Sequence, residues 1–412
     1  MPSARALRRE LVAALERRGR IRSKAVRKAF STVPRELFVP EVAQREGLER
    51  VYADAALVTR QSTQGTALSS SSQPAIMAEM LECLDLRPGL RVLEIGTGTG
   101  YNAALLWKLV APSGTVTSVE LEADLAAAAE AALRAGGYPV TVLAGDAHSV
   151  VDGQRGAYER IVVTASSDHV PRGWRDALVD GGLLELPLWL PGSGKGEQLV
   201  VTLRRDGEAL RSVAIVPGGF MDLRHPGQDP LPRPVATLSV SEFVEGKGRA
   251  LASVSGPGLT TLRPAARRRL AAVMLSKPQV RRVATPAPAN SSLIAYLGMA
   301  DAPDGVPVRS FRPEPGGGYR AVAGVASRDG SGLALAVGRS GRPGCRIEVY
   351  GEGPGARTAA RSLDELVRRW RKAGRPSLAD CEISITYSVP PTGSGLQVAN
   401  HNDCFVALRW PG

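Results

Sequence analysis

The sequence is poor in cysteine and aromatic residues, and it has no long apolar run. Four cysteines occur in 412 residues and none has CxxC spacing, which excludes a disulfide framework and a cysteine-ligated zinc site. No segment approaches the roughly 18 apolar residues of a membrane span, and the basic N-terminus has no apolar stretch of signal-peptide length. We therefore expect a cytoplasmic protein with no membrane partner and no metal.

Acidic residues are also in the minority. The chain has 52 Lys and Arg against 40 Asp and Glu, a net charge of +12. Residues 227–412 hold 25 of the basic and 14 of the acidic residues, whereas residues 1–226 are almost neutral. Excess positive charge favours anionic partners, and by itself it leaves nucleic acid, an anionic surface and an acidic peptide open.

Apolar periodicity predicts an α/β fold for the first half. Residues 5–30 form two amphipathic helical stretches broken near Gly19. After residue 84, short apolar runs alternate with helical runs, the rhythm of a parallel sheet covered by helices. The strand runs are RVLEI, TVTSVE, VTVLAG and RIVVTA, and the helical runs are NAALLWKLV, ADLAAAAEAALRAGG and RGWRDALVDGG. Two further strands, LLELPLWL and GEQLVVTLRR, are expected to form an antiparallel hairpin at the edge of this sheet.

Prolines interrupt all periodicity at GQDPLPRP, residues 227–234, which predicts a linker. Beyond it, helices near 264–275 and 357–373 are mixed with short strand runs, a pattern typical of a small α+β domain. We expect four segments: N-terminal helices with the substrate entrance (1–80), an α/β domain (81–226), a linker (227–235) and a basic C-terminal α+β domain (236–412).

The run VLEIGTGTGYN, residues 92–102, is the strongest chemical signal. A strand leads into a GxGxG turn formed by Gly96, Gly98 and Gly100, where glycine lets the backbone approach a ligand. Glu120 ends the next strand, where a carboxylate can accept from both ribose hydroxyls. Glu94 would repel a pyrophosphate and suits the cationic methionyl part of S-adenosylmethionine. The spacing therefore favours this cofactor over a dinucleotide, the alternative being an ordinary strand-to-helix turn.

A third strand is followed by Gly145, Asp146 and Ala147. Asp146 is placed to accept from the adenine amino group at the carboxyl end of the sheet, where open α/β sheets bind ligands. An Asp that caps a turn is at least as common, so both readings of this residue stay open.

Several motifs in order resemble the protein-L-isoaspartate O-methyltransferase family. They are LSSSSQPAIMAEML (68–81), VLEIGTGTGYN, GDA, YERIVVTA and an LxLP strand, with AFSTVPRELFVPE and Tyr52-Ala53-Asp54 upstream. The resemblance covers about residues 5–225. It implies a Rossmann-like methyltransferase sheet that transfers a methyl group from S-adenosylmethionine to an isoaspartyl carboxylate, leaving S-adenosylhomocysteine.

The resemblance also assigns site residues. Ser72 matches the serine that lies beside the cofactor and the substrate carboxylate, and Thr164, Ala165 and Gln198 match substrate contacts. Hydroxyls at Ser72 and Thr164 would orient a carboxylate that is already ionised, so no general base is required. With the loop residues, the expected cofactor contacts are Ser71, Gln73, Met77, Glu94, Gly96, Thr97, Gly98, Gly100, Tyr101, Glu120, Leu121, Asp146 and Ala147.

The chain departs from typical members in two places. The segment ALVTRQSTQGTALSS, residues 56–70, is longer and more polar than the family's turn and is expected to be a loop. The chain also continues for nearly 190 residues, and with the segment GFMDLR this layout resembles extended relatives associated with ribosomally made peptides (lanthipeptides, graspetides and lasso peptides). That resemblance implies methylation of one aspartate, whose ester loses methanol to form an aspartimide.

Arginines are concentrated in the added region. Such residues suit an acidic or modified peptide, although a solvated arginine-rich surface is equally compatible. Aromatic residues are scarce beside them, which makes nucleic acid an unlikely partner. General repair of isoaspartyl proteins, an RNA methyltransferase and a non-catalytic peptide-binding scaffold are the alternative functions. The arginines in question are Arg267, Arg268, Arg269, Arg357, Arg361, Arg368, Arg369 and Arg371, with Lys372.

Overall fold

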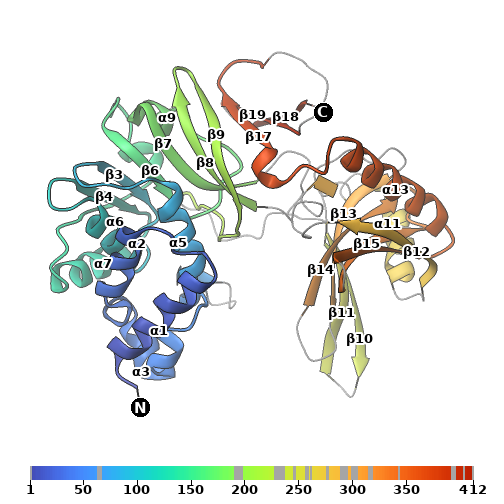
Figure 1. The fold of residues 1–412 in the computed structure, drawn as a ribbon, viewed down its shortest axis with the longest axis horizontal. Coiled ribbons are helices and arrows are strands. Elements are labelled where there is room, and N and C mark those ends of the chain that lie inside the picture. Colours follow the sequence, from blue (N-terminus) through green and yellow to red (C-terminus); the bar gives the residue numbers. More distant parts are fainter. Residues whose placement is uncertain are drawn as a thin grey trace.

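The fold is known from a computed structural model, shown as a ribbon in Figure 1. It describes residues 2–62, 67–189, 198–226, 237–244, 247–255, 259, 262–274, 278–287, 296–297, 305–313, 319–341, 344–390, 396–401 and 404–410. The expected linker at 227–235 and the PGSGKG turn lie outside the described residues.

Short helices form the N-terminal part. The first two begin at serine caps, since the side chains of Ser3 and Ser23 accept from backbone N–H groups of the first turn. Apolar side chains three and four residues apart then bury one face against the sheet domain. The elements are α1 (Ala4–Arg17), α2 (Lys24–Thr32), the 3₁₀ helix η1 (Arg35–Phe38), α3 (Pro40–Glu46), α4 (Leu48–Val51) and α5 (Pro74–Cys83).

A parallel sheet forms the centre of the first half, as the alternating runs predict. Its order is β7-β6-β3-β4-β5, all paired in parallel. Helices cover both faces, with α1, α2, α5 and α6 in one core cluster and α8 and α9 in the other. This confirms the Rossmann-like α/β class. The elements are β3 (Arg91–Ile95), α6 (Tyr101–Val110), β4 (Thr115–Glu120), α7 (Ala123–Ala135), β5 (Thr141–Ala144), α8 (Ala147–Val150), β6 (Tyr158–Val163), α9 (Arg172–Ala177) and β7 (Leu178–Trp189).

Two local expectations were wrong. The expected helix over residues 172–182 ends at Ala177, and the remaining LVDGG begins β7, because Leu178 pairs with Tyr158 of β6. The polar segment 56–70 is not only a loop: β1 (Leu57–Gln61) and β2 (Ala67–Ser71) pair as an antiparallel ribbon. Strand pairing between distant residues decides both cases, and a sequence window does not contain it.

The sheet continues into antiparallel strands, and the C-terminus of the chain returns to it. The expected hairpin forms from β7 and β8 (Gln198–Asp206), and β9 (Ala209–Pro217) pairs with β8. The last strands then add to β9 in the order β17-β19-β18. Residues 382–409 therefore extend the first sheet, which differs from the expected single C-terminal unit of residues 236–412. These strands are β17 (Glu382–Thr386), β18 (Leu396–His401) and β19 (Cys404–Arg409).

A second sheet, antiparallel throughout, occupies the added region (Figure 1). Its order is β10-β11-β13-β14-β15-β16-β12, and α11 and α13 pack on it with separate apolar clusters. The expected helices at 264–275 and 357–373 are confirmed. The elements are β10 (Thr237–Val244), β11 (Lys247–Ser255), α11 (Pro264–Met274), β12 (Pro278–Ala287), β13 (Gly305–Pro313), β14 (Tyr319–Ser327), β15 (Leu333–Gly341), β16 (Gly344–Glu352), α13 (Ala356–Lys372) and the 3₁₀ helix η2 (Leu378–Asp380).

Among the described residues, no helix combines the length and apolar character needed to cross a bilayer.

Candidate active site

The glycine loop between β3 and α6 has a backbone that requires glycine. Gly96, Gly98 and Gly100 have φ values of +95°, +53° and +85°, a region that other residues rarely adopt. The loop is fixed to β4, because the N–H groups of Gly96 and Thr97 donate to the carbonyl of Val119 at 2.8 and 3.2 Å. The loop follows the carboxyl end of β3, the edge at which open α/β sheets bind ligands.

Glu120 ends β4 beside this loop and is buried. One carboxylate oxygen accepts from Gly98 N–H at 2.8 Å and the other from Glu122 N–H at 3.3 Å. A carboxylate offers about four acceptor positions, so Glu120 retains the capacity to accept from two ribose hydroxyls.

Glu94 lies behind the loop with no exposed surface. Its Oε1 accepts from Asn102 Nδ2 at 2.8 Å and its Oε2 from Ser118 Oγ at 2.5 Å. Thr97 Oγ1 lies 2.6 Å from Ser118 Oγ and extends this network into the loop. Burial raises the pKa of Glu94 to about 7, against the opposing effect of both hydrogen bonds. Glu94 thus joins β3, β4 and α6 beneath the loop, and its contact with a cationic ligand stays a prediction.

The raised pKa of Glu94 predicts how stability depends on pH. Between pH 4.5 and 7 the folded protein holds a proton on Glu94 that the unfolded chain has lost, so this group makes the free energy of unfolding fall as pH rises through that window. The loss is on the order of 3 kcal/mol. Glu94→Gln should remove it, and urea unfolding at pH 5 and pH 8 without ligand measures the difference. Glu159→Gln is the control, because Arg91 lowers the pKa of Glu159; equal slopes in both variants would contradict the assignment.

Strand β2 places the serine run, residues 69–72, against the glycine loop. A Cβ built on Gly98 would lie 3.6 Å from the carbonyl oxygen of Ser70. Ser71 is buried, and Ser72 follows it half-buried. Within the described part of the chain, the hydroxyl of Ser72 has no hydrogen-bond partner. Ser72, two residues beyond the Ser70 carbonyl that lies against the loop, therefore has a hydroxyl donor available to a ligand.

Thr164 follows β6 on the other side of the loop. Its Oγ1 donates to Gly96 O at 2.6 Å and lies 3.1 Å from Ile95 O. The hydroxyl hydrogen is thus used on the backbone of the loop, so Thr164 fastens Gly96 in place. Orientation of a substrate carboxylate by Thr164 stays a prediction, and it requires this hydrogen bond to be exchanged.

Arg35, which the sequence analysis did not single out, holds the serine run in place through hydrogen bonds. It is fully buried, and no carboxylate of the described residues forms an ion pair with it. Its guanidinium donates to Ser72 O at 2.9 Å, to Val51 O at 2.9 Å and to Ser71 Oγ at 3.3 Å, and it lies 5.8 Å from the ring centre of Tyr101. Burial lowers the pKa of Arg35, but arginine stays charged. The sequence feature that could have identified Arg35 is its position as a single arginine in the largely apolar segment STVPRELFVP.

A strap, residues 220–225, crosses the carboxyl ends of the strands after β9. Gln198 binds the backbone of Phe220 with both amide atoms, at 2.9 and 2.5 Å. Ser166 accepts from Leu223 N–H at 2.8 Å, and Arg224 forms an ion pair with Glu122 at 2.7 Å. The expected substrate contact Gln198 therefore holds the strap, and its contact with substrate stays a prediction.

The remaining expected residues differ in burial and in hydrogen-bond partners. Gln73 is exposed and donates to Asp54 O at 3.1 Å. Asp146 caps the four-residue helix α8, because its Oδ1 accepts from His148 N–H at 3.0 Å. The others are buried or half-buried: Met77, Tyr101, Leu121, Ala147 and Ala165.

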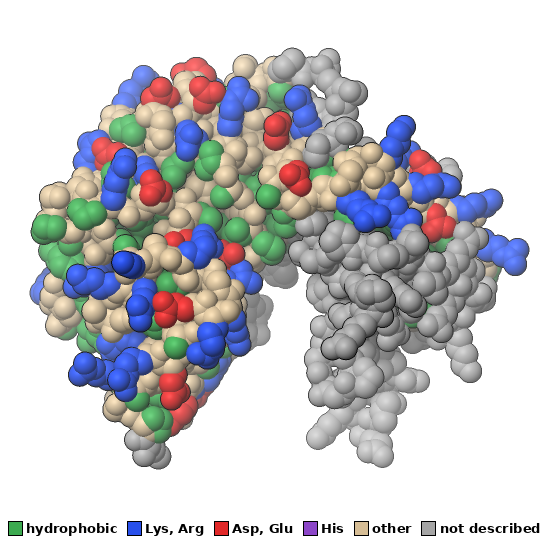
Figure 2. Space-filling view, viewed as in Figure 1, with side chains coloured by type: hydrophobic (Ala, Val, Ile, Leu, Met, Phe, Trp, Pro, Cys, Tyr) green, Lys and Arg blue, Asp and Glu red, His purple; other side chains and the backbone are tan. Residues whose placement is uncertain are grey.

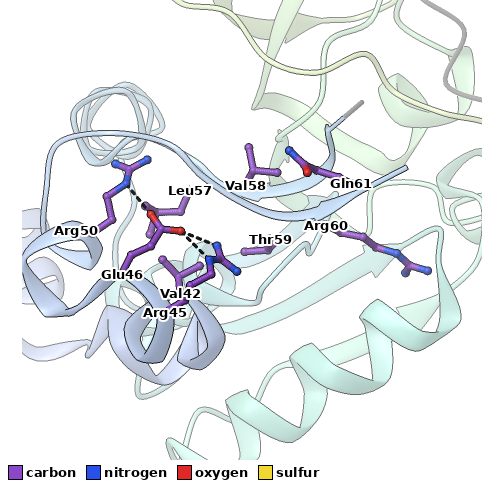
Figure 3. Close-up of a pocket in the computed structure, with 9 residues that line it drawn as sticks. All are labelled: Val42, Arg45, Glu46, Arg50, Leu57, Val58, Thr59, Arg60 and Gln61. Carbon is purple, nitrogen blue, oxygen red and sulfur yellow. Dashed lines mark hydrogen bonds and ion pairs between the residues drawn. The ribbon is translucent and has the colours of Figure 1, made fainter. Parts of the chain in front are cut away.

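A cavity of about 430 Å³ opens on the outer side of β1 (Figure 3). Glu46 accepts from Arg45 at 2.6 Å and from Arg50 at 3.3 Å, while Arg60 extends away to an ion pair with Asp124 at 2.6 Å. Its lining residues come from α3, α4 and β1, and none of them belongs to the glycine loop.

The donor set of the crevice fits S-adenosylmethionine. Glycine at position 96 lets Thr164 approach the loop closely, since a Cβ there would overlap Thr164 Oγ1. We predict that Glu120 accepts from the ribose hydroxyls and that Asp146 accepts from the adenine amino group. The GxGxG spacing likewise favours this cofactor over a dinucleotide.

Comparisons with known proteins point to one family. The model of the protein-L-isoaspartate(D-aspartate) O-methyltransferase family matches residues 6–217. The chain is 39% identical to the protein-L-isoaspartate O-methyltransferase of Methanothermobacter thermautotrophicus over 48% of this chain and 85% of that protein. It is 36% identical to that of Hyperthermus butylicus over 53% and 89%.

A solved structure of a protein-L-isoaspartate O-methyltransferase is similar in fold, with 22% identity and a TM-score of 0.50. It covers 93% of this chain and 97% of its own, so the likeness of fold is not confined to residues 6–217. The chain belongs to the protein-L-isoaspartate(D-aspartate) O-methyltransferase family and is an S-adenosylmethionine-dependent carboxyl O-methyltransferase.

Proposed function

We propose that this methyltransferase acts on an aspartyl or isoaspartyl carboxylate of an acidic, modified peptide, and that the ester becomes an aspartimide. In the second step the backbone nitrogen that follows the ester attacks its carbonyl carbon, the C–OCH₃ bond breaks, and methanol leaves with the amide proton. The observation that carries the proposal is the basic surface of the added region, since residues 227–412 carry nearly all of the net charge.

Residues around the glycine loop would perform the transfer. The bound cofactor supplies an electrophilic methyl group. Ser72 would donate to one oxygen of the substrate carboxylate and leave the other aimed at that methyl group, while Arg35 fixes the Ser72 backbone. Because a carboxylate is ionised at neutral pH, the chain needs to remove no proton. Holding the reacting atoms in line can supply on the order of 7 kcal/mol.

Helix α13 presents the clearest basic surface. Ala359, Leu363 and Trp370 are buried against the second sheet, so the opposite face is in solvent, and Figure 2 shows Lys and Arg side chains gathered there. Glu365 offsets part of this charge through ion pairs at 2.7 and 3.2 Å. The exposed basic residues of the helix are Arg357, Arg361, Arg368, Arg369 and Lys372.

Helix α11 contributes less of this surface. Arg267 Nε donates to Leu259 O at 2.9 Å, and Arg269 Nε donates to Asp329 O at 2.8 Å. Two arginines of the expected basic run therefore bind backbone of their own domain, and Arg268 is exposed. The proposal accordingly places peptide recognition on α13.

A charge-reversal pair tests the proposal. Arg357→Glu/Arg361→Glu should raise KM for an aspartate-rich, internally cross-linked peptide about tenfold, with KM for a short isoaspartyl peptide unchanged. Mass spectrometry measures the ester as a gain of one CH₂ and the aspartimide as a loss of one water from the unmodified peptide. Arg5→Glu/Arg9→Glu is the matched control, because these residues have the same spacing on the exposed side of α1.

Two outcomes would favour general repair of isoaspartyl proteins instead. One is comparable turnover across a panel of unrelated isoaspartyl peptides with no ester on the acidic peptide. The other is an equal effect of both charge-reversal pairs. Labelling of RNA with steep salt dependence would indicate an RNA methyltransferase, and loss of ester in Ser72→Ala with retained cofactor binding would exclude a non-catalytic scaffold.

A further inference from the structure

Three of the four histidines in the chain gather at the carboxyl end of β5. The ring centre of His148 lies 5.1 Å from that of His225 and 6.0 Å from that of His169. Asp146 caps the helix that carries His148, and its Oδ2 lies 3.9 Å from Nδ1 of His225. These residues come from three separate segments, and Asp146 and His225 are nearly 80 positions apart, so only the tertiary fold brings them together.

The geometry points to a transition-metal site formed by Asp146, His148 and His225. One ligand atom from each residue lies within 4.8 Å of the other two. Ligands about 2.0–2.2 Å from a tetrahedral zinc ion lie about 3.4 Å apart, so the 3.9 Å between Asp146 Oδ2 and His225 Nδ1 needs only a small adjustment. Rotation of these half-exposed side chains would bring the three ligand atoms to the distances that one metal ion requires.

The donor set selects the metal class. Two imidazoles and one carboxylate suit Zn²⁺, Co²⁺ or Ni²⁺, whereas Mg²⁺ and Ca²⁺ prefer oxygen ligands throughout. Three protein ligands leave an open position for water. Asp146 is oriented for this role, because its Oδ1 already accepts from His148 N–H and leaves Oδ2 toward His225. Oriented carboxylate ligands of this kind are typical of metal sites.

The site lies where the strap ends. The strap is held by contacts with Gln198, Ser166 and Glu122 before it reaches His225. These three contacts fix the position of His225 beside Asp146. A metal ion bound there would fasten the end of the strap to β5. It would also occupy the Asp146 oxygen that the adenine amino group needs, so metal and cofactor should compete. This competition rests on the proposed adenine contact of Asp146, whereas metal binding does not.

Cobalt absorption of the full-length, untagged protein tests the site. Co²⁺ added after chelator treatment should show the visible absorption of a four- or five-coordinate ion, and Zn²⁺ should displace it. His225→Ala should weaken Co²⁺ binding at least tenfold, and His401→Ala on β18 should not change it. Wild-type Co²⁺ binding by His225→Ala, or an absorption no stronger than that of hydrated Co²⁺, would overturn the proposal.

The second measurement is calorimetric binding of S-adenosylhomocysteine, which also reports that His225→Ala is folded. Saturating Zn²⁺ should raise the Kd of the wild-type protein about tenfold and leave that of His225→Ala unchanged. If Co²⁺ binds as expected but Zn²⁺ leaves the Kd for S-adenosylhomocysteine unaltered, the result contradicts the adenine contact of Asp146 and supports the metal site. If S-adenosylhomocysteine binds and Co²⁺ does not, the result contradicts the metal site and leaves the proposed function unaffected.

Discussion

Arg35→Met should strongly lower both the stability of the protein and its rate of methyl transfer. The side chain is fully buried and donates to the carbonyls of Val51 and Ser72, both at 2.9 Å. Each buried acceptor left without a donor costs about 1–3 kcal/mol, partly offset by the removal of a buried charge. We expect the free energy of unfolding to fall by about 3 kcal/mol.

The effect on turnover of Arg35→Met has a separate cause. Its guanidinium holds the backbone of Ser72 and contacts Tyr101 at the start of α6, so it couples the serine run to the cofactor loop. Loss of this coupling should reduce kcat/KM about 100-fold, mainly through kcat, because misplacement of the serine affects the aligned reacting atoms.

Arg18→Met is the matched control for Arg35. Arg18 forms an ion pair with Asp54 at 3.0 Å, but its side chain is 63% exposed, and such pairs contribute at most about 1 kcal/mol. Arg35→Lys should recover part of the stability and little of the turnover, since a lysine cannot reproduce the planar fork. Equal losses in Arg18→Met and Arg35→Met, or full turnover in Arg35→Lys, would contradict the positioning role.

Gly96→Ala should weaken cofactor binding at least 100-fold. Gly96 has a φ of +95°, and a Cβ at this position would overlap Thr164 Oγ1. The left-handed backbone alone costs an alanine roughly 1–2 kcal/mol. The overlap adds to this cost by breaking the Thr164 hydrogen bond to Gly96 O, at 2.6 Å, and moves the loop. Calorimetric titration with S-adenosylhomocysteine should show a Kd at least 100-fold higher.

Gly137→Ala separates backbone strain from overlap. Gly137 also has a positive φ, +73°, but nothing lies within 4 Å of its would-be Cβ. This variant should lose roughly 1–2 kcal/mol of stability and keep cofactor affinity. Gly96→Ala/Thr164→Ala removes the overlapping hydroxyl and should recover part of the affinity. No recovery in the double variant would show that strain, and not Thr164, excludes a side chain at Gly96.

Much of the candidate site could be predicted from local sequence. The glycines and Glu120 belong to one strand-turn-helix-strand unit, whose conformation follows from residues close together in the chain. The roles of side chains were harder to predict. Thr164 uses its hydroxyl hydrogen on Gly96 O, and Gln198 binds the backbone of Phe220. A side chain's hydrogen-bond partner depends on which distant backbone lies opposite it, and a motif does not contain that information.

The sequence by itself determined the α/β class, the glycine loop and the division of charge between the two halves, because periodicity, glycine spacing and composition are local or additive properties. Tertiary structure decided the rest. It joined residues 382–409 to the first sheet through β9, buried Arg35 under Ser72, and gathered His148, His169 and His225 at one strand end. Each of these features depends on strand order and packing between distant segments, which the free energy of the whole fold selects.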